Sequence, residues 1–124
     1  MPKRILDVGQ CNPDHASLTQ FLQSHFDVEI DRSHQLDDSL EKLRDTAYDL
    51  VLINRKLDRD YTDGMAILER IKSDDSLKSI PVMIISNYDD AQEAAIASGA
   101  EPGFGKAELS ENRTVEKVRA VLGS

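Results

Sequence analysis

Two short, uninterrupted apolar runs, at residues 50–53 and 82–85, constrain the fold of this chain more than any other feature. A half-exposed strand alternates apolar and polar residues, whereas an unbroken apolar run is typical of a strand buried on both faces. Such strands occur in parallel sheets that helices cover from both sides. We therefore expect both runs, the second followed by Ser86, at the centre of an α/β domain.

Strand patterns alternate with helical patterns along the rest of the chain. Further strands are predicted at residues 5–8, at 26–30 near a sheet edge, and weakly at 102–106. Asn12 is expected to cap the first helix, because Pro13 suits a first helical position. The spacing of apolar residues predicts five helices: 12–24, 36–45, 65–71, 89–98 and one between a Ser110 cap and Gly123.

Five strands alternating with five helices imply right-handed crossovers and a parallel sheet with helices on both faces. We expect one flavodoxin-like (βα)5 domain over residues 1–124, a three-layer sandwich with sheet order 2-1-3-4-5. Because this domain takes up the whole chain, no output domain is expected. In such folds the functional site lies beyond the carboxyl ends of the strands.

Charge and composition exclude several classes of function. The chain of 124 residues has a formal net charge of −8, which argues against contact with nucleic acid or anionic membranes. Its single cysteine, Cys11, excludes an internal disulfide framework and fits a reducing compartment. No apolar stretch is long enough for a signal peptide or a membrane span. These features predict a cytoplasmic protein that is a monomer or a weak dimer.

The predicted strand ends carry little that can do chemistry. They fall at Gly9-Gln10, Asn54, Ser86-Asn87 and Lys106. The amide of Asn54 is neutral and cannot serve as a carboxylate nucleophile, and Mg²⁺ prefers carboxylates that these positions lack. We therefore expect no catalytic residue, no metal and no cofactor.

Four blocks of sequence resemble the receiver domain of bacterial two-component response regulators. They are "RILDVGQCNPDH", "DLVLINRKL…DG", "IPVMIIS" and "SGAEPGFGK", and the likeness covers essentially all 124 residues. In that family two acidic residues that bind Mg²⁺ end the first strand, and an aspartate that accepts the phosphoryl group ends the third. The resemblance places Gly9 and Gln10 at the acidic pair and Asn54 at the phosphoacceptor.

Other family positions are retained or altered. The resemblance assigns the hydroxyl residue after the fourth strand to Ser86 and the lysine of the fifth to Lys106, here followed by alanine instead of proline. The aromatic switch residue falls on Gly103, beside Phe104. The loop after Asn54 is about two residues longer than is usual in the family. The acceptor and both metal ligands are missing together, which indicates a naturally degenerate receiver.

Asp7 is unusual because it is a carboxylate inside a strand that helices should cover, where an unpaired charge is costly. One interpretation is that it reaches the strand end and is hydrated. The other is that it lies below the altered pocket and pairs with Lys106, Arg55 or His15, compensating electrostatically for the missing acidic pair. Lys106 itself is expected to pair with an internal carboxylate or carbonyl.

Three functional hypotheses follow. The first is a pseudo-receiver, a non-enzymatic module that binds a signalling protein independently of phosphorylation. Its binding face would be the fourth helix, fifth strand and fifth helix, residues 88–122, with Tyr88, Tyr61 or Phe104 as anchors unless Phe104 is core. The second is a small-anion-binding or enzymatic domain that uses Lys106, Ser86 and Asn54. The third, a phosphorelay receiver, would need another acceptor such as Asp7 or Asp58.

Overall fold

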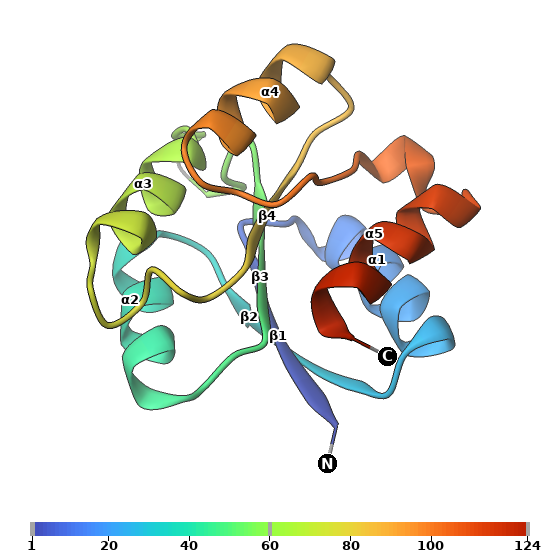
Figure 1. The fold of residues 1–124 in the computed structure, drawn as a ribbon, viewed down its shortest axis with the longest axis horizontal. Coiled ribbons are helices and arrows are strands. Elements are labelled where there is room, and N and C mark those ends of the chain that lie inside the picture. Colours follow the sequence, from blue (N-terminus) through green and yellow to red (C-terminus); the bar gives the residue numbers. More distant parts are fainter. Residues whose placement is uncertain (1, 60, 124) are drawn as a thin grey trace.

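The computed structural model describes residues 2–59 and 61–123, and its centre is a parallel sheet (Figure 1). Four strands pair in the order β2-β1-β3-β4. Val8 lies opposite Ile53, and Ile53 opposite Ile84, so the carboxyl ends of β1, β3 and β4 meet at one edge. The strands are β1 (Lys3–Val8), β2 (Val28–Ser33), β3 (Leu50–Asn54) and β4 (Val82–Ile85).

Helices cover both faces of the sheet, as the unbroken apolar runs predict (Figure 1). They are α1 (Asn12–His25), α2 (Leu36–Asp45), α3 (Met65–Ser73), α4 (Asp89–Ala97) and α5 (Asn112–Leu122), with a short 3₁₀ helix η1 (Lys106–Glu108). One apolar cluster joins the sheet to α2, α3 and α4, and the other joins it to α1 and α5. The flavodoxin-like three-layer arrangement is confirmed. No helix of the described residues is long and apolar enough to cross a membrane.

The predicted fifth strand is reduced to a single bridge. Within the described residues, positions 102–106 form no strand, although Phe104 pairs in parallel with Ile85 at the place predicted for the fifth strand. The carboxamide of Gln92 lies between the neighbouring backbones, because it donates to Ile84 O at 2.9 Å and accepts from Gly103 N at 3.0 Å. A side chain therefore replaces a backbone pairing at the edge of β4.

Several predicted boundaries are wrong by one to a few residues. Cys11, in extended conformation, is the N-cap of α1, and Asn12 is the first helical residue. The second strand begins at Val28 and runs to Ser33. Glu111 and not Ser110 is the N-cap of α5, because η1 and its turn occupy the preceding residues. These shifts leave the ends of β1, β3 and β4 where the sequence predicts them.

Candidate functional site

Leu57 fills the space beside the end of β1. Gly9 has a φ of +77°, and a Cβ atom built on it would lie 2.5 Å from Leu57 Cδ2. Leu57 is only 2% exposed. Two donors hold the loop over this strand end, because Asn54 Nδ2 and Asp58 N both donate to Gly9 O, at 3.1 and 3.0 Å. An apolar side chain thus closes the space beside Gly9, the residue predicted at the first position of the acidic pair.

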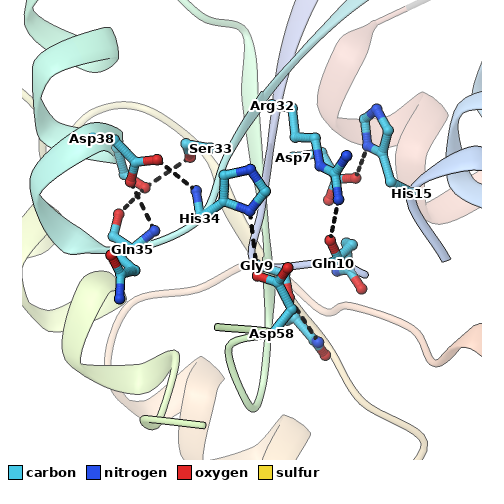
Figure 2. A network of polar contacts seen from close by, with 12 residues as sticks. Asp7, Gly9, Gln10, His15, Arg32, Ser33, His34, Gln35, Asp38 and Asp58 are labelled. Carbon is cyan, nitrogen blue, oxygen red and sulfur yellow. Dashed lines mark hydrogen bonds and ion pairs between the residues drawn. The ribbon is translucent and has the colours of Figure 1, made fainter. Parts of the chain in front are cut away.

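Gln10, at the second position of the pair, is fully buried. Its main-chain carbonyl oxygen accepts from Arg32 Nη2 at 2.8 Å (Figure 2). Neither the oxygen nor the nitrogen of its side-chain carboxamide has a hydrogen-bond partner in the described part of the chain. A hydrated Mg²⁺ keeps several water molecules and needs carboxylates. Gly9, Gln10 and Asn54 therefore do not fit this metal. The described residues also hold no cluster of three or more His, Cys, Asp or Glu side chains that could bind one.

Asp7 pairs with His15 across the layer between β1 and α1 (Figure 2). His15 Nδ1 lies 2.6 Å from Asp7 Oδ2, and Asp7 is 1% exposed. Burial raises the pKa of Asp7 to about 6, against the opposing effects of His15 and Arg32. The hydrated interpretation of Asp7 is wrong, and its partner is His15; its electrostatic compensation for the missing acidic pair stays a prediction. Because β1 is pleated, Asp7 points toward α1, below the strand end.

Lys106 and Arg55, the two other candidate partners of Asp7, form ion pairs with other carboxylates. Lys106 Nζ lies 2.7 Å from Asp14 Oδ2, as expected for a lysine with an internal partner. This hydrogen bond is the main reason that the pKa of Asp14 falls below its usual value. Arg55 Nη1 lies 2.9 Å from Asp63 Oδ2 in the loop after β3.

Ser86 and Asn87 connect β4 to neighbouring segments. The Ser86 hydroxyl oxygen accepts from Tyr88 N at 3.2 Å, at the entry to α4. The side-chain oxygen of Asn87 accepts from Ala107 N at 3.1 Å, which ties the end of β4 to η1. Ser86 and Asn87 therefore have structural partners at this strand end.

Gln92 is a residue that the sequence reasoning missed. Its Nε2 donates to Ser86 O at 3.1 Å as well as to Ile84 O, while Lys117 Nζ donates to Gly103 O at 2.9 Å. A Cβ atom at Gly103 would lie 2.4 Å from Ile84 O, so the switch position has no room for an aromatic side chain in this arrangement. Phe104 is fully buried in the core and cannot be a surface anchor. The glycine at position 103 was the one signal of this close packing.

A concavity of about 610 Å³ opens between the strand ends and α4. We call it the α4 concavity. It is lined by residues 54–56 after β3, residues 85–88 after β4, Asp90, Ala91 and Ala94 of α4, and Lys106. Asn54, Ser86 and Lys106, the three residues of the predicted pocket corner, all contribute to its wall.

A parallel sheet with helices on both faces and polar residues at its carboxyl strand ends is the architecture of a flavodoxin-like α/β domain. The profile of the response regulator receiver domain matches residues 13–118, and the chain belongs to this family. A comparison with curated proteins finds no match.

Solved structures of response regulators have the same fold. The receiver domain of a DNA-binding response regulator from Colwellia psychrerythraea 34H is 26% identical, with a TM-score of 0.79 over 98% of this chain and 99% of that one. A two-component response regulator from Clostridium difficile is 21% identical, with a TM-score of 0.76 over 98% and 96%. NtrX from Brucella abortus is 24% identical, with a TM-score of 0.82 over 99% of this chain but only 28% of NtrX.

Proposed function

We propose that this receiver domain is a cytoplasmic, non-enzymatic module that binds a signalling protein independently of phosphorylation. The observation that carries the proposal is Leu57, which fills the space beside Gly9 where the family has an acidic side chain. Phosphoryl transfer depends on a positioned nucleophile and on metal ions that neutralise the phosphoryl oxygens. Here the nucleophile position is an amide, and the metal position is closed.

The alternative acceptors are poorly placed for phosphorylation. Asp7 is buried and bonded to His15, so a phosphoryl donor cannot reach it. Asp58 Oδ1 lies 3.4 Å from His34 Nδ1, and the backbone N–H of Asp58 donates to Gly9 O. Neither carboxylate lies beside Lys106, whose ammonium is bonded to Asp14. These contacts favour the binding module over a phosphorelay component.

The proposal is tested by an amide NMR titration of the full chain with Mg²⁺ and then with beryllium fluoride, a phosphoryl mimic. We expect no saturable shift at Gly9, Asn54 or Lys106. Intact-mass measurement after incubation with acetyl phosphate should likewise find no phosphoryl adduct. Saturable shifts that spread from these residues to Phe104 would overturn the proposal.

The variant Asn54→Asp distinguishes between two reasons for the absence of phosphorylation, a missing nucleophile and a closed metal site. Asn54→Asp restores the carboxylate alone, and we expect it to remain unmodified because Leu57 still closes the metal position. The triple variant Gly9→Asp, Asn54→Asp, Leu57→Ala restores two acids and removes the apolar side chain. Mg²⁺ binding by Asn54→Asp as strong as that of the triple variant would show that Leu57 is not the obstacle.

A further inference from the structure

Lys72, near the end of α3, is a half-buried lysine that bonds to carbonyl groups instead of a carboxylate. Its Nζ donates to Lys78 O at 2.9 Å and to Ile80 O at 2.8 Å, and it forms no ion pair with the residues that the structure describes. By contrast, the exposed Lys78 pairs with Asp75 at 3.1 Å. A carbonyl is a neutral acceptor and does not balance a half-buried positive charge as a carboxylate does.

The surroundings of Lys72 favour its neutral amine. A Cβ atom built on Gly99 would lie 3.2 Å from Lys72 Cγ, so the turn after α4 packs on the aliphatic part of the side chain. Burial lowers the pKa of Lys72, against the opposing effect of Glu101. Near neutral pH a larger fraction of this amine is therefore uncharged than in an exposed lysine, and only the uncharged amine is a nucleophile.

The two carbonyls also orient that amine. An ammonium has three N–H donors, and the loop between α3 and β4 takes two of those of Lys72. Among the described residues, the third N–H has no acceptor. Loss of this third proton keeps both hydrogen bonds and leaves a tetrahedral nitrogen whose lone pair is directed away from the two carbonyls. Because Lys72 is partly exposed, a small reagent can reach this lone pair.

We propose that Lys72 is an acyl-acceptor site that reacts with small acyl phosphates. The lone pair of Nζ attacks the acyl carbon, and a C–N bond forms. The bond from that carbon to the bridging phosphate oxygen breaks, its electron pair leaves with the phosphate, and water takes the proton of the amine. No part of this inference depends on the proposed function.

Acylation should loosen the loop between α3 and β4. The product is an amide with a single N–H, which cannot donate to Lys78 O and Ile80 O together, as the amine does. One carbonyl of the loop therefore loses its partner. Amide hydrogen exchange at Lys78 and Ile80 should become faster in the acylated chain.

The test measures how fast acetyl phosphate acetylates each lysine of the full chain, by tandem mass spectrometry that resolves Lys72 from Lys78. At about pH 7 we expect Lys72 to react at least about threefold faster, although Lys78 is the more exposed of the two. The advantage should disappear near about pH 11, where both amines are neutral and only their accessibility differs.

Two carboxylate variants and one lysine variant sharpen the test. Glu101→Gln removes the carboxylate that opposes the fall in the pKa of Lys72, so it should speed acetylation of Lys72 further. Glu93→Gln, at an exposed position of α4, changes the net charge equally and should leave that rate unchanged. Lys72→Arg keeps donors for both carbonyls and should abolish the fast-reacting site.

Equal acetylation rates of Lys72 and Lys78 at about pH 7, or the same pH dependence for both, would overturn the inference. Unchanged amide exchange at Ile80 after acetylation would refute the predicted loosening of the loop. An acetyl adduct and a phosphoryl adduct differ in mass, and only a phosphoryl adduct contradicts the proposed function. The two failures are therefore distinguishable in one experiment.

Discussion

At the scale of single residues, Asp7 is the group that the fold perturbs most clearly. Its carboxylate is buried between β1 and α1, and its bond to His15 offsets only part of the cost of removing a charge from water. Burial raises its pKa from the usual 3.8 to about 6. A raised pKa means that the folded state holds a proton more tightly than the unfolded state does.

The stability contributed by Asp7 is therefore fully present below about pH 3.8 and is lost as the pH rises through about 6. The shift corresponds to about 3 kcal/mol. In urea denaturation, Asp7→Asn should gain stability relative to the wild type by up to that amount between about pH 4 and about pH 7.

The control for this comparison is Asp75→Asn, which removes a carboxylate that is 96% exposed. Its stability difference from the wild type should stay constant over the same pH range. A constant difference for Asp7→Asn as well would mean that the Asp7–His15 pair does not respond to pH in this range.

At the scale of elements, Gln92 joins α4, β4 and the segment around Gly103. One carboxamide serves three backbone groups: it donates to two carbonyls of the β4 region and accepts from Gly103 N. Gly103 is the residue predicted to stand at the aromatic switch position. The hydrogen bonds of Gln92 hold this region in one arrangement.

Gln92→Ala should leave Ile84 O, Ser86 O and Gly103 N without this partner and destabilise the fold by about 1–3 kcal/mol. Amide hydrogen exchange at Gly103 should become faster, because its N–H loses its acceptor. Gln20→Ala, at an exposed position of α1, is the matched control and should change neither quantity. An unchanged exchange rate at Gly103 in Gln92→Ala would contradict the role given to this side chain.

At the scale of the whole molecule, two apolar clusters share one sheet. Leu68 belongs to the cluster under α2, α3 and α4, and Leu22 to the cluster under α1 and α5. Both side chains are fully buried. Because every central strand contributes to both clusters, neither can lose its packing while the other remains intact. We infer that the domain unfolds as one cooperative unit.

Leu68→Ala and Leu22→Ala should each lower the free energy of unfolding by about 2–5 kcal/mol. Near-UV circular dichroism reports on the buried Tyr48 in the first cluster, and far-UV dichroism reports on the whole backbone. Both signals should shift to the same new unfolding midpoint in each variant. A Leu22→Ala variant in which only the far-UV signal shifts would mean that the clusters unfold separately.

The layers, the order of the four strands that form and the ends of β1, β3 and β4 could be predicted, because apolar runs and helical spacing are local signals that burial enforces. The partner of Asp7 could not be predicted from the sequence, because the choice among Lys106, Arg55 and His15 depends on the tilt of α1. Leu57 could have been noticed in the sequence, because it is an apolar residue within a charged loop. The interaction of Gln92 with Gly103 joins residues whose contact depends on tertiary packing.

Gln92 also has a consequence for solubility. A four-stranded sheet that lacks a regular fifth strand would leave one edge open to pairing with other chains, a common route to aggregation. At the outer edge of β4, Val82 O accepts from Glu101 N at 2.8 Å, and the carboxamide of Gln92 occupies the next two carbonyls, of Ile84 and Ser86. An incoming strand finds these acceptors already taken, so this edge of the sheet offers no template for further growth.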